Sequence, residues 1–300
     1  MSRYVVTGAA GFIGSHLVDA LLARGDDVVA LDSFTDYYDP ARKEDNAQAF
    51  EVRRLDLADD TLELDGVRGV FHLAAQAGVR PSFEHFDVYL RRNVLATQRL
   101  LESAVAAGTR IVFASSSSVY GDAERYPTPE DADLRPISPY GITKLAAEQL
   151  VAAYPVDAVV LRYFTVYGPR QRPDMGFSLL IDALLDDREF ELFGDPSRSF
   201  TFVGDVVEAT IAAMERAPGG AVYNVGGGEE ATLREAIATL ERISGRVARI
   251  RQGDRARGDA RRTAADVERI REGLAWTPTT SLEDGLHAQW SWAADRVAAR

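Results

Sequence analysis

The chain has 300 residues, 46% of them hydrophobic, which is enough for a large core and for two lobes. Its formal net charge of −12 argues against nucleic acid or anionic membranes as partners. The chain has no cysteine, which excludes disulfides and thiolate metal sites, and its four histidines are not spaced as metal ligands, so we expect no metal. No apolar run reaches the length of about 18 residues that a membrane span needs, and Met1 leads directly into a strand without a secretory signal, so we expect a cytoplasmic protein.

A short strand leads directly into a glycine-rich turn at the N-terminus. We expect the strand at residues 3–7, followed by Gly8, Gly11 and Gly14 in the spacing Gly-x-x-Gly-x-x-Gly and by a helix that ends near Gly25. Gly8 allows a tight turn, Gly11 lets the backbone approach a pyrophosphate, and Gly14 lets the helix pack on the strand. The pattern predicts a dinucleotide whose phosphates lie at the helix N-terminus.

An acidic residue follows the second strand. Residues 28–31 form this strand, and Asp32 comes directly after it, 18 residues past Gly14. A carboxylate at this place accepts hydrogen bonds from the hydroxyls of the adenosine ribose and repels a 2′-phosphate. We therefore predict NAD rather than NADP as the cofactor.

Strand-like and helix-like stretches alternate along the chain, which predicts an α/β fold with a doubly wound parallel sheet of the Rossmann type. We expect an NAD-binding domain at 1–168 and a smaller substrate-binding lobe at 169–300, with a strand at 221–225 that returns to the main sheet. A proline-rich loop at 122–139 is expected to border the pocket. Further strands are expected at 50–55, 69–73, 110–114 and 156–161, and helices at 90–107 and 138–154.

Ser116, Tyr140 and Lys144 are the candidate catalytic residues. Ser116 follows the strand at 110–114, at the end of a sheet strand where α/β proteins bind ligands. Tyr140 and Lys144 share one face of a helix because they are four residues apart. A free phenol has a pKa of about 10 and is a poor base unless a cation favours the phenolate, and Lys144, one of only two lysines, supplies a compact cation. We predict that the group moves a proton at a sugar alcohol while a hydride is transferred.

These motifs occur together with several others. They are Asp56-Leu57, His72-Leu73-Ala74-Ala75, Asn93, four serines from Ser115 to Ser118, Arg162-Tyr163-Phe164-Thr165-Val166-Tyr167-Gly168-Pro169, Arg198-x-Phe200-Thr201 and Gly258-Asp259. Over nearly its whole length the chain resembles the extended short-chain dehydrogenase/reductase family, specifically its branch of nucleotide-sugar epimerases and dehydratases.

The resemblance implies a bound NAD, a UDP-sugar substrate and a homodimer formed by the helices at 90–107 and 138–154. It implies that Arg198 binds the UDP phosphates. The family's Arg-x-Gly-Asp motif is displaced by one position here, so Arg255 and Arg257 both stay open as phosphate ligands, and we name Arg257 as the candidate. The residues expected to contact NAD are Gly8, Gly11, Phe12, Ile13, Gly14, Asp32, Asp56, Leu57, Leu73, Ala74, Ala75, Asn93, Tyr140, Lys144 and Tyr163.

Two serines decide between the reactions of the family. Its dehydratases have Asp-Glu after the catalytic hydroxyl, because a carboxylate must remove a proton alpha to a ketone, and its UDP-glucuronate decarboxylases have Ser-Glu. This chain has Ser117 and Ser118 at these positions, which leaves 4-epimerisation through a transient 4-keto sugar.

The segment 32–39 and Arg172 make the chain more similar to UDP-glucuronate 4-epimerases than to UDP-galactose epimerases, which have Asn in place of Thr165. We expect Ser117, Ser118 and Thr165 to hold the sugar carboxylate by charge-assisted hydrogen bonds, with Arg172 as gate or counter-ion. A carboxylate held close to the plane of the keto group resists decarboxylation.

Other readings stay open at this point. One alternative is that the hydroxyl groups of Ser117, Ser118 and Thr165 serve only backbone atoms at the strand end. UDP-glucose 4-epimerisation is the second candidate activity, ahead of UDP-glucuronate decarboxylation. A non-enzymatic NAD-binding scaffold is disfavoured, because the serine, tyrosine and lysine are all present.

Overall fold

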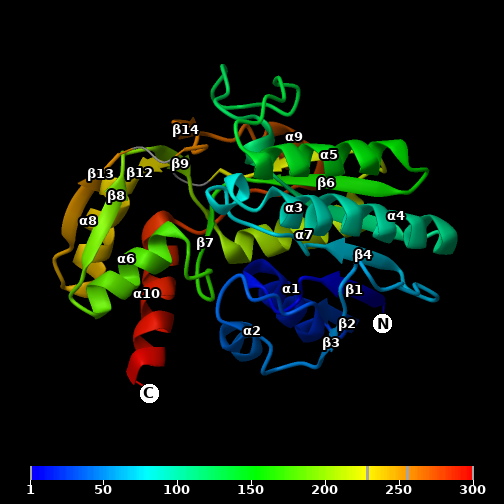
Figure 1. Cartoon of the computed structure of the whole chain (residues 1–300), viewed down its shortest axis with the longest axis horizontal. Helices are drawn as coiled ribbons and strands as arrows, with labels where there is room; N and C mark the ends of the chain where they lie inside the picture. The colour runs from blue at the N-terminus through cyan, green and yellow to red at the C-terminus, as the bar shows by residue number, and fades with distance from the viewer. Residues whose placement is uncertain (1, 228–229, 255–256, 299–300) are drawn as a thin grey trace.

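A central parallel sheet organises the computed structural model, which describes residues 2–227, 230–254 and 257–298 (Figure 1). Its strands are β1 (Arg3–Thr7), β2 (Asp27–Asp32), β3 (Val52–Arg54), β4 (Gly69–His72), β5 (Arg110–Ser116), β6 (Ala158–Tyr163) and β11 (Val222–Val225). They lie in the order β11-β6-β5-β4-β1-β2-β3, and every pair is parallel. The predicted Rossmann-type fold is confirmed, and β11 pairs with β6 in the main sheet.

Helices cover both faces of the sheet because the side chains of each strand alternate between two cores. On β1, Tyr4 and Val6 belong to the core on the side of α1 and α7, whereas Val5 belongs to the core under α4 and α5 (Figure 1). The helices of the two faces are α1 (Phe12–Ala23), α7 (Val203–Arg216), α9 (Glu268–Leu274), α4 (Ala96–Ala107) and α5 (Pro139–Ala153).

The remaining elements include a second lobe with its own aromatic core, drawn at the left of Figure 1. The Phe177 ring lies 4.7 Å from that of Phe200 and 5.6 Å from that of Tyr167. The lobe is built from α6 (Gly176–Leu185), α8 (Leu233–Ser244), α10 (Leu282–Ala298), β7 (Val166–Tyr167), β8 (Glu189–Phe193), β9 (Ser197–Ser199), β10 (Thr201–Phe202), β12 (Glu230–Thr232), β13 (Arg249–Gly253) and β14 (Arg262–Thr263). The shorter helices elsewhere are α2 (Pro40–Asn46), η1 (Pro81–Phe83), α3 (Phe86–Tyr89), η2 (Leu90–Leu95) and η3 (Ser117–Val119).

Two local expectations differ from the structure. The helix expected at 90–107 begins as the π-helix η2 and continues as α4, so its first turns are wider than those of an α-helix. The loop at 122–139 lines none of the cavity described below. Instead the N–H of Thr128 donates to the carbonyl oxygen of Ala264 at 2.7 Å, and the carbonyl oxygen of Thr128 accepts from the N–H of Asp266 at 3.0 Å. This backbone pairing satisfies polar groups that would otherwise be buried without partners.

Candidate active site

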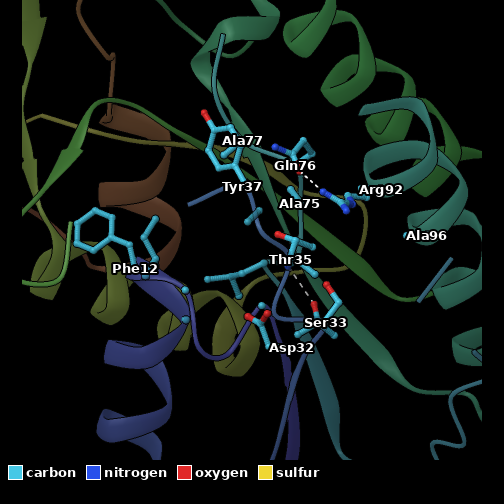
Figure 2. A pocket seen from close by; sticks show the side chains of 18 of the residues that line it. Phe12, Asp32, Ser33, Thr35, Tyr37, Ala75, Gln76, Ala77, Arg92 and Ala96 are labelled. Carbon is cyan, nitrogen blue, oxygen red and sulfur yellow. Dashed lines mark hydrogen bonds between the residues drawn. The ribbon is translucent and has the colours of Figure 1, made fainter. Parts of the chain in front are cut away.

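A cavity opens at the carboxyl ends of the strands, where the strand order reverses between β1 and β4. Ligands of doubly wound sheets bind at this switch point. The cavity is lined by the glycine turn, by Asp32 and by Tyr140 and Lys144. Figure 2 shows part of the lining, including Phe12, Asp32 and Gln76. Of the residues predicted from the sequence, it is lined by Gly8, Gly11, Phe12, Ile13, Gly14, Asp32, Asp56, Leu57, Leu73, Ala74, Ala75, Tyr140, Lys144, Tyr163 and Arg172.

The glycine turn fits a dinucleotide because its backbone leaves no space for side chains. A Cβ atom at Gly8, where φ is +70°, would lie 2.8 Å from the backbone nitrogen of Ala74. A Cβ atom at Gly14 would lie 2.1 Å from the carbonyl oxygen of Gly8. Gly11 is the N-cap of α1, so free backbone N–H groups of this helix end face the cavity as a phosphate requires.

Asp32 is held in place by the backbone on both of its oxygens. Oδ2 accepts from the N–H of Ala10 at 3.2 Å and Oδ1 from that of Phe34 at 2.7 Å. Lys43 lies on the same side, with Nζ 3.3 Å from Oδ1 of Asp32 and 3.3 Å from Oγ1 of Thr35. Figure 2 shows Asp32 and Ser33 below Thr35 in the cavity lining, and this group of oxygens suits a ribose with two hydroxyl groups.

Ser116 and Tyr140 meet although they come from different elements. Ser116 ends β5, and Tyr140 lies in the first turn of α5, where Ser138 caps the helix by accepting from the N–H of Gly141 at 3.1 Å. Burial raises the pKa of Tyr140, and the hydroxyl of Ser116 and the charge of Arg172 offset only part of this rise. The buried phenol therefore favours its protonated form, and the hydroxyl and the cation reduce the cost of ionising it.

Lys144 contacts the strand beside α5. Its Nζ donates to the carbonyl oxygen of Ala114 at 2.6 Å and lies 4.7 Å from the centre of the Phe113 ring. Burial lowers the pKa of Lys144 to about 8, and the charge of Glu148, one helical turn further on, raises it. Lys144 thus joins α5 to β5, and it lines the same cavity as Tyr140 and Arg172.

Arg172 is fixed by a bridge across the cavity. Its Nε and Nη2 donate to the two carboxylate oxygens of Asp174 at 3.0 and 3.1 Å. Asp174 also accepts from the hydroxyl of Tyr37 at 3.0 Å. Because Tyr37 belongs to the loop after β2, the bridge connects the cofactor side of the cavity to the segment that leads into α6.

Glu148 ties the α5 helix to the neighbouring strands. It accepts hydrogen bonds from Ser115 on β5 and, at 2.8 Å, from Nη2 of Arg162 on β6. Arg162 also donates to the hydroxyl of Tyr120 at 2.8 Å. This buried network supports the helix that carries Tyr140.

Several predicted residues do not line the cavity. Asn93 is buried behind the wall, where Oδ1 accepts from the N–H of Gln76 at 2.7 Å and Nδ2 donates to the Gln76 carbonyl and to Thr143. Tyr163 lines the cavity, but its hydroxyl is directed to Thr210 at 2.7 Å. Ser116, Ser117, Ser118, Thr165, Arg198 and Arg257 lie outside the cavity lining.

A chain of hydrogen bonds supports the same wall from behind. Thr97 donates to the carbonyl of Asn93 at 2.7 Å, so the Nε2 of His72, 3.0 Å from the Thr97 oxygen, must carry the proton. The Nδ1 of His72 then accepts from Thr7 at 2.8 Å, and Thr7 accepts from the N–H of Ala74 at 3.1 Å. Burial lowers the pKa of His72 to about 3, which keeps the ring neutral.

The arginines expected to bind phosphate belong to the second lobe. Arg198 donates to the carbonyl of Ala260 at 2.8 Å, and the guanidinium of Arg257 lies 4.2 Å from the centre of the Phe83 ring. Arg80, which the sequence analysis did not select, lies beside the same segment, with Nη2 3.5 Å from Oδ2 of Asp259. Arg255 lies outside the described residues.

Several further polar residues line the cavity and were missed by sequence reasoning, among them Gln76, Arg92, Lys43 and Tyr37. Gln76 and Arg92 are joined by a hydrogen bond of 2.6 Å from Nη1 to Oε1 (Figure 2). Lys43 and Tyr37 come from the segment after Asp32. The rarity of lysine in this chain was a usable signal for Lys43, whereas no local pattern distinguishes Arg92 from the other arginines.

Residues 4–226 match the family described as the NAD dependent epimerase/dehydratase family. The chain belongs to this family. Among curated relatives, an uncharacterized UDP-glucose epimerase of Bacillus subtilis is 40% identical over 302 residues, which cover 95% of each chain. A UDP-glucuronate 4-epimerase of Thermodesulfobacterium geofontis is 34% identical over 317 residues, which cover 99% of this chain and 98% of the relative. A crystal structure of UDP-glucuronic acid 4-epimerase from Bacillus cereus with UDP-glucuronic acid and NAD has a TM-score of 0.95 at 39% identity, covering 98% of this chain and 99% of that one.

Family membership confirms the predicted cofactor, NAD, and the predicted enzyme class. The glycine turn and Asp32 agree with it, because both line the cavity that NAD requires. Within the described part of the chain, no group of three metal-ligating side chains is found, and no helix there is long and apolar enough to span a membrane.

Proposed function

We propose that this protein is a UDP-glucuronate 4-epimerase, which interconverts UDP-glucuronate and UDP-galacturonate with NAD as cofactor. The observation that carries the proposal is the position of Tyr140 at the end of the dinucleotide cavity, with a hydrogen bond from Ser116 and the charge of Arg172 beside it. The similarity to UDP-glucuronate 4-epimerases supports the choice of sugar.

Tyr140 acts as the base and acid at the 4-hydroxyl of the sugar. When bound, NAD supplies the acceptor and donor of hydride. Ser116 orients the 4-hydroxyl and relays its proton to Tyr140, and the Ser116 hydroxyl and the charge of Arg172 reduce the cost of ionising this buried phenol. The 4-keto sugar then presents its other face, and Tyr140 returns the proton to the new alcohol. The sequence of steps consumes no cofactor.

A second set of side chains, close to Ser116, is proposed to recognise the uronate. We infer that Ser117, Ser118 and Thr165 bind the sugar carboxylate and that Arg172 provides its counter-charge. Ser118 lies beside Ser116, with 3.1 Å between their hydroxyl oxygens, so the carboxylate site adjoins the reacting carbon. Holding the carboxylate close to the keto plane protects the β-keto acid from losing carbon dioxide.

The remaining site roles follow from the same proposal. Arg198 and Arg257 bind the UDP phosphates, and Asn93 contributes by fixing the backbone of Gln76 at the cofactor wall. The other predicted cofactor residues bind NAD directly from the cavity lining. UDP-glucose is the second candidate substrate, favoured by the name of the Bacillus subtilis relative.

We also propose a homodimer of two-lobed, cytoplasmic subunits. Helices α4 and α5 pack against each other and, with the adjoining η2, expose large apolar side chains, including Leu90 at 48%, Leu95 at 39% and Ile142 at 50%. A symmetric pairing of these helices would bury these side chains. We keep the predicted division into an NAD-binding domain of residues 1–168, with the strand near 221–225, and a substrate lobe of 169–300, from which α7 and α9 pack back on the central sheet.

Proton NMR of the purified protein with UDP-glucuronate or UDP-glucose, without added NAD, tests the substrate. We expect UDP-glucuronate alone to be converted to its 4-epimer, with no UDP-pentose. Conversion of UDP-glucose alone would retain the mechanism and refute the assigned carboxylate site. Formation of UDP-xylose would show that the carboxylate is not protected.

A further inference from the structure

One buried cation in the cofactor cavity has no part in the chemistry at the sugar. Lys43 is on helix α2, and its side chain, only 9% exposed, lines the cavity beside Asp32. Its Nζ is 3.3 Å from Oδ1 of Asp32, 3.3 Å from the hydroxyl of Thr35 and 5.4 Å from the centre of the Tyr38 ring. The only other lysine of the chain is Lys144.

Lys43 is not needed to orient Asp32. The carboxylate already accepts one backbone N–H on each oxygen, from Ala10 and from Phe34. Each carboxylate oxygen can accept about two hydrogen bonds, so with Lys43 and Phe34 on Oδ1, Oδ2 remains able to bind a ribose hydroxyl. The main effect of the ammonium group is therefore on the charge at this end of the cavity.

That charge bears on the choice between NAD and NADP. An isolated carboxylate at this position repels a 2′-phosphate, whereas a carboxylate paired with an ammonium group presents a net charge close to zero. The ammonium and the hydroxyl of Thr35 are also donors that a phosphate can accept from.

We propose that Lys43 sets how strongly this protein prefers NAD to NADP, by neutralising Asp32 and so weakening the exclusion of a 2′-phosphate. The inference rests on the ribose position proposed for Asp32 and is independent of the sugar. Near a protein surface, at an effective dielectric constant of about 20, a unit charge a few ångströms from a phosphate changes binding by more than tenfold, and solvent screening reduces this. We expect the loss of the ammonium to sharpen selection for NAD roughly tenfold.

Competition between the two dinucleotides measures this directly. The full-length protein is dialysed to equilibrium against mixtures of NAD and NADP, the bound dinucleotides are released with acid, and their ratio is determined by chromatography. Lys43→Met should raise the ratio of bound NAD to bound NADP roughly tenfold over the unmodified protein. Lys43→Arg, which keeps the charge, should change it less than threefold.

Two further variants make the outcome decisive. Arg42→Met removes a cation from the same helix, but Arg42 faces Asp182 at 3.8 Å and does not line the cavity, so the ratio should stay unchanged. Asp32→Asn leaves Lys43 unopposed and should lower the ratio. If the ratio of bound NAD to bound NADP is unchanged or lower in Lys43→Met, the proposal is wrong. If Asp32→Asn then still lowers this ratio, the ribose position of Asp32 stands and only the role of Lys43 is refuted. If Lys43→Met does not fold, Lys43→Gln provides the same test.

Discussion

The Nζ of Lys144 donates a hydrogen bond of 2.6 Å to the carbonyl oxygen of Ala114, thirty positions earlier in the chain. This bond fixes α5, which carries Tyr140, to the end of β5, which leads to Ser116. The proposed base and the serine are thus aligned by a cation that is itself buried. The Tyr140-x-x-x-Lys144 pattern on α5 therefore depends on β5 beside it to place Tyr140 next to Ser116.

Replacing Tyr140 by Phe removes the proposed base and leaves the ring in place. We expect turnover to fall by about 10²- to 10⁴-fold, the usual contribution of general acid–base catalysis, while NAD and UDP still bind. Steady-state kinetics together with calorimetric titration of UDP would measure both effects. Tyr154→Phe, at the far end of α5, is the matched control and should remain active. Near-normal turnover of Tyr140→Phe would remove the base from the mechanism.

Replacing Arg172 by Met should affect a uronate more than a neutral hexose. A hydrogen bond to a charged group contributes about 1.5–3 kcal/mol, so calorimetric titration should show binding of UDP-glucuronate weakened at least tenfold more than binding of UDP-glucose. Arg170→Met serves as the control, because Arg170 pairs with Asp19 at 2.7 Å and lies outside the cavity lining. Equal losses with the two sugars would contradict carboxylate recognition.

Glu148 should influence the alkaline side of the pH–rate profile. Burial lowers the pKa of Lys144 to about 8, and Glu148 raises it from the still lower value that burial alone would give. Glu148→Gln should therefore move the loss of activity with rising pH to a lower pH, because Lys144 becomes neutral sooner. Glu44→Gln, which removes the exposed partner of Arg54, should leave the profile unchanged. A Glu148→Gln profile that coincides with that of the parent would refute this coupling.

His72 should make stability fall in mild acid. Its pKa is about 3 in the folded protein and about 6.5 when unfolded, so below pH 6.5 the unfolded state binds a proton that the folded state does not. The free energy of unfolding should then decrease by about 1.4 kcal/mol per pH unit from this residue, down to a pH of about 3. Urea denaturation at several pH values should show this slope in the parent protein and its loss in His72→Asn. Parallel slopes for the two proteins would mean that His72 does not contribute.

The apolar face of α5 and the adjoining η2 gives a test of the homodimer. Introducing a charge with Leu90→Glu or Ile142→Glu should convert a dimer to monomers, because a carboxylate cannot be buried there without a partner. Light scattering coupled to size-exclusion chromatography would measure the mass. Val247→Glu, at a side chain 82% exposed in the other lobe, should leave the assembly intact. A monomeric parent protein would refute the dimer.

Prediction from sequence worked where the signal was local. The strands around the glycine turn and the cap at Ser138 follow from residues within one or two turns of each other, and β1 has the predicted bounds. The π-helix at 90–95 was not predicted, because its register depends on contacts such as that of Asn93 with Gln76 and Thr143. Likewise, nothing local indicates that the loop at 122–139 pairs with the chain near 264–266.

The sequence by itself determined the fold class and the type of chemistry, because glycine spacing, alternating strands and the Tyr-x-x-x-Lys pattern each express a short-range requirement of backbone geometry or helix periodicity. Only the tertiary structure decided which charges act on which groups. It places Arg172 near Tyr140 and Lys43 beside Asp32. It also directs the Nζ of Lys144 to the carbonyl oxygen of Ala114. These pairs depend on how the sheet, the loop after β2 and the second lobe pack, and electrostatic effects depend on distance in space, which the order of residues does not specify.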